Sequence, residues 1–354
     1  MKINRGIQLL AATAVGALAL TACGGGIPSD AQPQASIKAS GSSAQKNAMT
    51  EWISAYQRAN EGSTIEYQAN GSGAGIQDFN NGQTAFAGSD AAIAGADLTA
   101  ANQRCGGGPA INIPMVAGAI VAAYNIEGVE KLELSSSVLA KIFSSQITKW
   151  NDPAIATLNS GVSLPDATIV QYHRSDSSGT TDNFSQFLKT SAADQWSFET
   201  GKDWVAPGGQ GSKGNDGVSA AIKSTANSIG YVELSFAQDQ NLPMASIDNG
   251  GGAVAPTFES ASKGIETAKV IGTGNNLALQ LDYATDAPGA YPIVLVTYEI
   301  TCEKGLPADQ VLLTKSFLEY TATPEAQGKL GEIGYVPMPI DLLTKVNIAV
   351  GSIS

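Results

Sequence analysis

Hydrophobic and polar residues alternate along this chain with two different spacings. Short runs rich in apolar and β-branched residues predict strands at residues 36–39, 64–68, 116–125, 167–172 and 291–300. Apolar residues three or four positions apart predict helices at residues 45–59, 138–143, 181–189, 309–320 and 324–333. Strands and helices that alternate in this way are typical of an α/β architecture.

The N-terminal segment predicts export and a lipid anchor. A short basic region precedes an apolar run at residues 7–20, which is too short and too rich in Ala and Gly for a stable membrane span. The run ends in Leu-Thr-Ala followed by Cys23, a pattern that resembles the bacterial lipobox, in which the cysteine is lipidated. We expect a lipoprotein signal peptide at residues 1–22 and a tether at residues 23–35. The alternative is an ordinary secretory signal with a cysteine nearby.

Length and charge narrow the class of protein. The chain has 354 residues, and the part after the signal still exceeds the ~250–300 residues that one hydrophobic core usually holds, so two domains are expected. No other stretch reaches the ~18 consecutive apolar residues that a membrane span needs. The net charge of -12 argues against nucleic acid as a partner, because phosphate backbones are bound by clustered Lys and Arg.

Two cysteines remain once Cys23 is assigned to lipid. In an exported protein an isolated pair predicts one disulfide, between Cys105 and Cys302, and the alternative is two buried free thiols. Two cysteines and one histidine fall short of a structural zinc site, so no metal is expected.

This cysteine pair also predicts the order of the domains. A bond between an early and a late residue returns the end of the chain to its beginning, so a middle domain would be inserted between two crossings. We expect a discontinuous lobe I at residues 36–125 and 293–354 and a lobe II at residues 126–292, with a cleft between them.

Three segments share one local pattern of a strand, a small polar turn containing glycine, and a helix. They are residues 39–44, 70–75 and 173–180. Unpaired amides at a helix start favour an anion, glycine lets the backbone approach it, and Ser and Thr hydroxyls add donors. Any one such serine is more often only a helix cap, but three turns together predict an anion site.

Two charged residues refine this anion site. Arg174 offers a planar fork for two oxygens of a tetrahedral anion, with a surface salt bridge to Asp176 as its alternative role. Asp90 follows a small-residue turn, where a turn or helix cap is the alternative role. Phosphate keeps at least one proton near neutral pH, so an ionised Asp90 could accept a hydrogen bond from it. Fully ionised sulfate has no such proton.

These segments resemble the periplasmic-type phosphate-binding protein of the bacterial high-affinity ABC phosphate transporter. The most specific matches are Arg-Ser-Asp-Ser-Ser-Gly-Thr at residues 174–180 and Gly-Ser-Asp at residues 88–90, and the similarity covers almost the whole chain after the tether. The resemblance implies a two-lobed α/β periplasmic-binding-protein fold, type II-like, that closes its cleft on inorganic phosphate.

The resemblance also implies residue roles and partners. Asp176 would pair with Arg174, and the phosphate-binding set would be Ser43, Ala44 through its amide, Ser72, Asp90, Arg174, Ser178, Gly179 and Thr180. Many relatives have Thr-Phe where this chain has Ser43-Ala44. We expect a monomer without a cofactor, anchored to the bilayer through the Cys23 lipid. It would face the extracytoplasmic side of the cell membrane and deliver phosphate to a membrane-embedded ABC permease.

Other functions and ligands remain as alternatives to phosphate transport. A secreted phosphatase or hydrolase is disfavoured because the chain lacks a Gly-x-Ser-x-Gly elbow and has a single histidine, His173. A phosphate sensor on the same scaffold would share the site and differ only in its partners. Asp90 argues against sulfate and molybdate as ligands, whereas arsenate shares the proton of phosphate.

Overall fold

A computed structural model describes residues 35–354 of the chain. The predicted signal peptide, the lipid-bearing Cys23 and all but the last residue of the tether lie outside the described residues. Among the described residues, no helix is both long and apolar enough to cross a membrane.

The described residues build one central eight-stranded sheet, with strand order β2-β1-β3-β13-β4-β8-β6-β7. Its strands are β1 (Ala35–Gly41), β2 (Ser63–Gln68), β3 (Phe86–Ser89), β4 (Ala110–Asn125), β6 (Val170–Arg174), β7 (Gln210–Ser212), β8 (Ser228–Glu233) and β13 (Val294–Cys302). Two small sheets contain β5 (Glu133–Ser135), β9 (Ser246–Asp248) and β10 (Ala253–Val254), and β11 (Lys269–Val270) with β12 (Leu279–Gln280).

Helices follow most of these strands, as the alternating pattern predicted. They are α1 (Lys46–Ala59), α2 (Ser72–Asn80), α3 (Gly95–Arg104), α4 (Ser136–Phe143), α5 (Pro153–Leu158), α6 (Gly179–Ser191), α7 (Gly214–Ser224), α8 (Leu234–Asp239), α9 (Phe258–Glu266), α10 (Ala308–Thr321), α11 (Pro324–Gly328) and α12 (Ile340–Gly351). The predicted apolar face of α1 is confirmed, because Met49, Trp52 and Tyr56 are buried. Ser135 accepts a hydrogen bond from Val138 N and caps α4.

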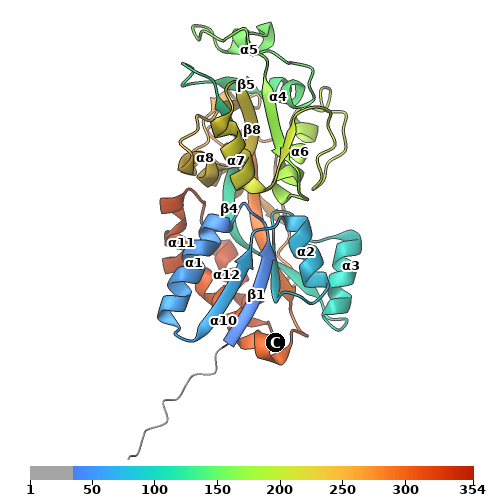
Figure 1. Cartoon of the computed structure of the whole chain (residues 1–354). Helices are drawn as coiled ribbons and strands as arrows, with labels where there is room; N and C mark the ends of the chain where they lie inside the picture. Colours follow the sequence, from blue (N-terminus) through green and yellow to red (C-terminus); the bar gives the residue numbers. More distant parts are fainter. Residues whose placement is uncertain (1–34) are drawn as a thin grey trace, which may run out of the picture. The chain divides into compact units, whose positions relative to one another are not determined.

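Strand β4 connects the two halves of the sheet. Its first part, up to Ala119, pairs with β13, and its last part, from Ile120 to Asn125, pairs with β8. In Figure 1 it runs between the lower helices, such as α1 and α10, and the upper helices, such as α6 and α7. The strand predicted at residues 116–125 is confirmed as part of β4, and all of β4 except Asn125 is buried, so it is covered on both faces. The lobe boundaries at residues 125 and 293 stay a prediction, since the described residues belong to one compact unit.

The predicted strand at residues 167–172 was placed too early. The strand β6 begins at Val170, where parallel pairing with β8 starts at Ser228. Thr168 instead forms an isolated antiparallel bridge with Lys149. The apolar pattern was correct for burial, but the strand's extent depends on a partner that lies elsewhere in the sequence.

The predicted helix at residues 324–333 is divided. The helix α11 ends at Gly328, and a 3₁₀ helix at Leu330–Ile333 follows it and ends at Gly334, where φ is 88°. A glycine at each of these ends explains the short helices, because glycine weakens a helix interior and readily adopts the left-handed conformation that terminates one.

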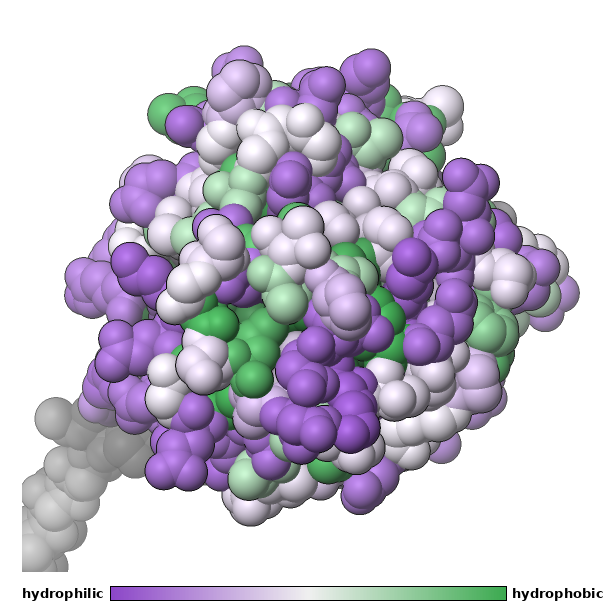
Figure 2. All heavy atoms as spheres, turned by 90° about the horizontal axis from the view of Figure 1, so that it is seen from above, coloured by the Kyte–Doolittle hydropathy of each residue, from purple (hydrophilic) through white to green (hydrophobic). Residues whose placement is uncertain are grey.

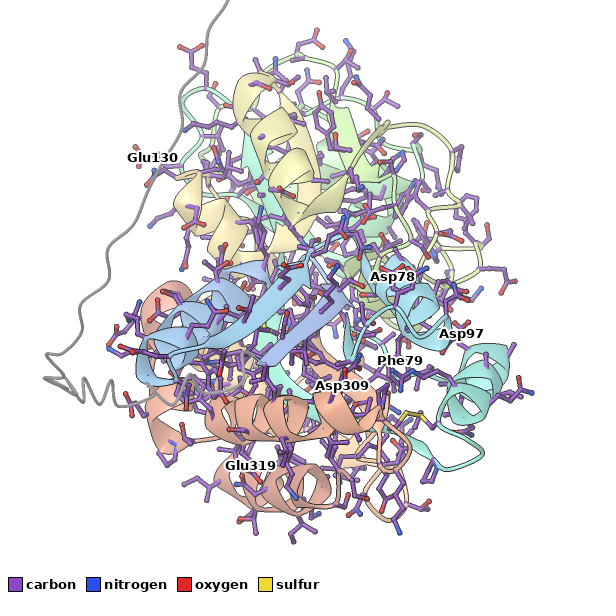
Figure 3. The ribbon with its side chains drawn as sticks, turned by 60° about the horizontal axis from the view of Figure 1, so that its bottom comes forward. Asp78, Phe79, Asp97, Glu130, Asp309 and Glu319 are labelled. Carbon is purple, nitrogen blue, oxygen red and sulfur yellow. A yellow bond between two sulfur atoms is a disulfide. The ribbon has the colours of Figure 1, made fainter. Side chains whose placement is uncertain are left out.

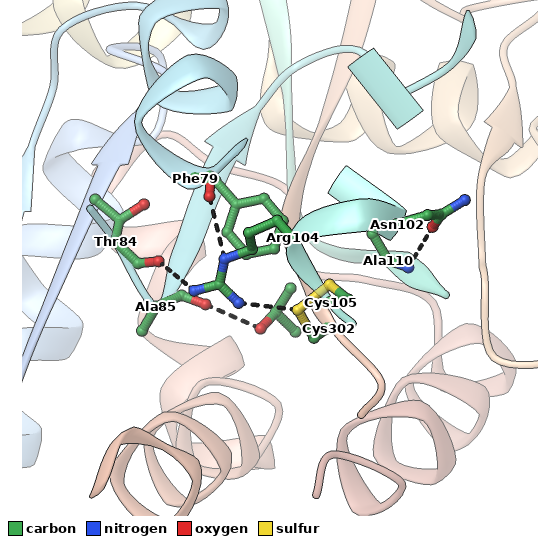
Figure 4. The surroundings of a disulfide bond; sticks show 9 residues. Phe79, Thr84, Ala85, Asn102, Arg104, Cys105, Ala110 and Cys302 are labelled. Carbon is green, nitrogen blue, oxygen red and sulfur yellow. Dashed lines mark hydrogen bonds between the residues drawn. A yellow bond between two sulfur atoms is a disulfide. The ribbon is translucent and has the colours of Figure 1, made fainter. Parts of the chain in front are cut away.

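Cys105 and Cys302 form a disulfide that joins the end of α3 to the end of β13, the yellow link in Figure 3. The Arg104 guanidinium lies 4.4 Å from the ring centre of Phe79. It donates to Phe79 O and Thr84 O and lies 2.9 Å from the Cys302 sulfur (Figure 4). One cation therefore connects α2, α3 and the disulfide in the first half of the sheet.

The surface is mixed in character. Figure 2 shows hydrophilic residues with small groups of hydrophobic ones between them on the face seen from above. The most exposed large hydrophobic residues among those described are Ile340 and Leu312, on α12 and α10.

Candidate functional site

The predicted anion-binding residues converge where strand ends meet helix starts. Strands β1 and β3 are parallel neighbours, with Gly41 opposite Gly88, so the turn after β1 lies beside Asp90. Strands β6 and β7 are also parallel, with Arg174 opposite Ser212, so α6 and α7 begin at the same edge of the sheet. The turn after β1 with Asp90 forms one edge of a polar cluster, and the starts of α6 and α7 form the other. The structure brings these two edges together, and all eight residues of the predicted phosphate-binding set are buried.

Asp90 lies at the centre of this cluster as an acceptor of hydrogen bonds. Its Oδ1 accepts from Ser42 Oγ and, at 2.8 Å, from Thr297 Oγ1. Its Oδ2 accepts from Thr180 Oγ1 at 3.3 Å. Its backbone N–H donates to Ser72 Oγ at 3.2 Å. The carboxylate therefore faces hydroxyl donors that come from both edges.

Burial determines the acidity of Asp90. Removal from water raises its pKa above the ordinary value, and the hydrogen bonds from Ser42, Thr297 and Thr180, together with the Arg174 charge, oppose this increase. A carboxylate held in this way has a strong tendency to accept a proton or a hydrogen bond from a ligand.

Arg174 supplies the positive charge of the site and is only 2% exposed. Its Nε donates to Asp176 Oδ1 at 2.7 Å and its Nη2 donates to Asp176 Oδ2, which makes the pair bidentate. Its Nη1 donates to Thr180 Oγ1 at 3.3 Å. Burial alone would raise the pKa of Asp176, but the hydrogen bonds and charge of Arg174 and the Gly214 N–H hold it below its usual range. The ion pair with Asp176 therefore exists but is buried rather than on the surface, and it orients the guanidinium.

The start of α6 approaches the opposite edge very closely. Ser178 Oγ accepts from Thr181 N at 3.2 Å and caps the helix. A Cβ on Gly179 would lie 2.6 Å from both Asp90 Cβ and Ser72 Oγ, so only glycine fits there without displacing its neighbours. Gly73 N also donates to Ser177 O at 3.0 Å. The helix start and its partial positive charge thus face Asp90 and Ser72 directly.

Ser43 and Ala44 occupy the turn between β1 and α1. Ser43 Oγ accepts from the backbone N–H and the side-chain Nδ2 of Asn215, at 3.1 and 3.0 Å. The Ala44 N–H donates to Ser42 Oγ at 3.0 Å. Ala44 is fully buried, and its carbonyl accepts from Tyr335 OH.

Several residues of the cluster were missed in the sequence analysis. Thr297 is one of the few polar residues in the mostly apolar strand β13. The register of that strand explains its place, because Tyr298 pairs with Ser89 next to Asp90. Asn183 Nδ2 donates to the carbonyls of Asp90 and Gly179 at 2.7 and 2.8 Å. Two more missed residues are Ser42 and Asn215. A polar residue inside a buried strand was the available signal for Thr297, whereas the others looked like ordinary turn and helix residues.

Two further carboxyl groups are buried behind the cluster. Burial raises the pKa of Glu299 to about 8, and the negative charge of Asp90 adds to the shift. Burial also raises the pKa of Glu233 well above its usual range. Glu233 Oε2 accepts from Ser235 N and Oγ, whereas neither carboxyl oxygen of Glu299 has a hydrogen-bond partner. Residues 35–354 contain no cluster of three or more His, Cys, Asp or Glu side chains that could hold a metal ion.

Fold and site together define a class of protein. A sheet shared by two helix groups, with a buried polar cluster where strand ends face helix starts, is the architecture of a periplasmic-type solute-binding protein.

Comparison with known proteins agrees with this class. Residues 27–325 match the PBP superfamily domain. Phosphate-binding protein PstS 3 of Mycobacterium tuberculosis is 44% identical over 372 aligned positions that cover 100% of both chains. Phosphate-binding protein PstS of Xylella fastidiosa is 34% identical and covers 90% of this chain and 86% of its own. The chain therefore belongs to the PBP superfamily and, within it, to the PstS phosphate-binding proteins.

Solved structures of low sequence identity share the fold. A high-affinity periplasmic phosphate-binding protein solved with phosphate superposes with a TM-score of 0.71 at 20% identity, covering 88% of this chain and 93% of that one. A phosphate-binding protein from Stenotrophomonas maltophilia gives a TM-score of 0.70 at 18% identity, with the same two coverages.

Proposed function

We propose that this protein binds inorganic phosphate in the buried cluster around Asp90 and delivers it to an ABC phosphate permease. The observation that carries the proposal is a buried carboxylate, Asp90, that faces several hydrogen-bond donors. Asp90 faces the hydroxyls of Ser42, Thr180 and Thr297, beside the Arg174 guanidinium and the start of α6. The PstS relatives are named as phosphate-binding proteins.

Selectivity follows from the protons of the ligand. Phosphate has several oxygens that can accept hydrogen bonds from Ser43, Ser72, Arg174 and the amides of α6. It also keeps a P–OH group that can donate a hydrogen bond to Asp90. Fully ionised sulfate would place an unprotonated oxygen against the Asp90 carboxylate. The carboxylate would then have no hydrogen bond from the ligand, and the two negative charges would repel each other. Arsenate carries the same proton as phosphate, so we expect it to bind.

The proposed mechanism is binding without covalent chemistry. Phosphate would contact Ser43, Ser72 and Asp90 on one edge and the Arg174–Thr180 segment on the other, so that closure of the two edges excludes water. The close approach of Gly179 to Asp90 and Ser72 supports a tight closed form. The relatives are binding proteins, which agrees with the absence of an enzymatic role in this proposal.

The proposal extends to location and partners. We place the protein outside the cytoplasmic membrane as a monomer, held at the bilayer by lipid on Cys23, where it would meet the permease. The lipobox-like sequence before Cys23 supports the anchor, and one structural relative is described as periplasmic. Mass spectrometry of the protein from membranes tests the anchor, because an unmodified N-terminus would exclude it.

Isothermal titration of the intact protein, stripped of bound anion, tests the ligand. We expect saturable heat with phosphate and none with sulfate at the same concentrations. No binding of phosphate would refute the proposed function. Equal binding of both anions would mean that the site binds anions without distinguishing phosphate from sulfate, and would refute the selectivity argument built on Asp90.

A further inference from the structure

Asn215 lies beside the proposed phosphate site, at the start of α7, and it is fully buried. Its side-chain Nδ2 donates to Ser43 Oγ at 3.0 Å and to Thr180 Oγ1 at 3.3 Å. Ser43 comes from the turn after β1, and Thr180 from the first turn of α6. One amide thus holds a hydroxyl from each edge of the cluster.

The orientation of this amide is determined by its neighbour. The backbone N–H of Glu233 donates to Asn215 Oδ1 at 2.8 Å. A backbone N–H can only donate, so the amide oxygen must face Glu233 and the two amide hydrogens must face the hydroxyls.

The hydroxyl of Ser43 is restricted as a result. A hydroxyl has two acceptor sites and one hydrogen. Both acceptor sites of Ser43 Oγ are used, one by the backbone N–H of Asn215 and one by its Nδ2. The hydrogen is the only remaining capacity, so Ser43 can donate to an anion but cannot accept a proton from it.

The hydroxyl of Thr180 is restricted in the same way. It accepts from Arg174 Nη1 and from Asn215 Nδ2, both at 3.3 Å. Its hydrogen points to Asp90 Oδ2, also at 3.3 Å. A ligand that enters between Thr180 and Asp90 can accept the hydrogen bond from Thr180 and donate a hydrogen bond from its own P–OH to Asp90. The amide therefore leaves Asp90 as the acceptor for the ligand's P–OH.

We propose that Asn215 is a positioning residue that makes the Ser43 and Thr180 hydroxyls obligatory donors to phosphate. The inference rests on the proposed function. It means that α7, which contains none of the predicted site residues, contributes to the affinity for phosphate. In Asn215→Ala the backbone N–H still donates to Ser43, but one acceptor site becomes free, and the hydroxyl can turn away from the anion.

A double-mutant cycle with Ser43 tests the inference. Phosphate Kd is measured by titration calorimetry for the intact wild-type protein, Asn215→Ala, Ser43→Ala and the double variant. Loss of one well-oriented buried hydrogen bond weakens binding about tenfold. We expect this loss for Asn215→Ala when Ser43 is present, and a markedly smaller loss, within about threefold, when Ser43 is alanine, because only the Thr180 contact is then removed.

Two more variants separate hydrogen-bond polarity from packing. Asn125→Ala removes a matched amide that donates to Ile222 O and Lys223 O at the other end of α7, and we expect unchanged Kd. Asn215→Asp keeps the size and the acceptor for Glu233 N–H but removes the donors, so it should weaken phosphate binding more than Asn215→Ala does. This variant also serves if Asn215→Ala does not fold.

The outcomes distinguish the inference from the proposed function. If wild-type protein fails to bind phosphate, both are wrong. If wild-type protein binds phosphate and Asn215→Ala raises the phosphate Kd by the same factor with and without Ser43, the proposed function stands, but the positioning role of Asn215 through Ser43 is wrong. Asn215→Asp that binds phosphate better than Asn215→Ala would also overturn the inference, because packing alone would then explain the effect.

Discussion

Asp90→Asn is the substitution that should change the ligand preference of the site. In the wild-type protein both carboxylate oxygens accept hydrogen bonds, Oδ1 from Ser42 and Thr297 and Oδ2 from Thr180. Asparagine keeps an oxygen for the first two donors and presents an NH₂ group in place of Oδ2. The position that faces the ligand therefore changes from an acceptor to a donor.

The size of the effect follows from the bonds exchanged. Phosphate would lose a hydrogen bond to a charged group, about 1.5–3 kcal/mol, which corresponds to about 10- to 150-fold weaker binding. Sulfate would lose an opposing buried charge and gain a donor. We expect its binding to rise from undetectable to within about tenfold of phosphate binding by the same variant.

Titration with each anion measures this change, and thermal unfolding of the anion-free protein controls for folding. Burial raises the pKa of Asp90, so its ionised form destabilises the folded state at neutral pH and the variant should unfold at a higher temperature. Asp78→Asn is a matched control, because Asp78 accepts from Ser40 and Asn70 at 2.7 and 3.0 Å outside the cluster. Unchanged phosphate affinity with no sulfate binding by Asp90→Asn would refute the reasoning.

Three further predictions concern packing and stability. Gly179→Ala should weaken phosphate binding at least tenfold in calorimetry, since its Cβ would lie 2.6 Å from neighbours across the cluster, whereas Gly217→Ala, with nearest atoms at 3.8 Å, should not. Burial raises the pKa of Glu299 to about 8, so the free energy of unfolding should fall by about 1.4 kcal/mol per pH unit as pH rises from about 4.5 towards 8. Glu299→Gln should flatten that part of the pH profile in denaturant titrations, and an unchanged slope would show that Glu299 is not the group responsible. Replacing Cys105 and Cys302 by Ser should cost up to about 5 kcal/mol of unfolding free energy, because the bond closes a separation of 197 residues, and a loss below about 1 kcal/mol would count against the chain-entropy explanation.

The sequence determined the parts of this protein that depend on local chemistry. The apolar spacing of α1 and the continuous apolar run of β4 are visible in the sequence because each segment carries its own burial pattern. The segment from Arg174 to Thr180 likewise contains a cation, its partner Asp176 and a helix cap within one short stretch.

Tertiary structure decided which distant residues meet. Six of the described helices were not predicted: α3, α5, α7, α8, α9 and α12. Strand β6 starts where β8 offers a partner. Thr297 reaches Asp90 only because β13 runs antiparallel to β3 in one register. Asn215 looks like an ordinary residue at a helix start until the sheet brings the first turn of α7 next to Ser43. The sequence displays the donors and the acceptor of the site, but the direction of each hydroxyl hydrogen depends on neighbours that only the folded chain supplies.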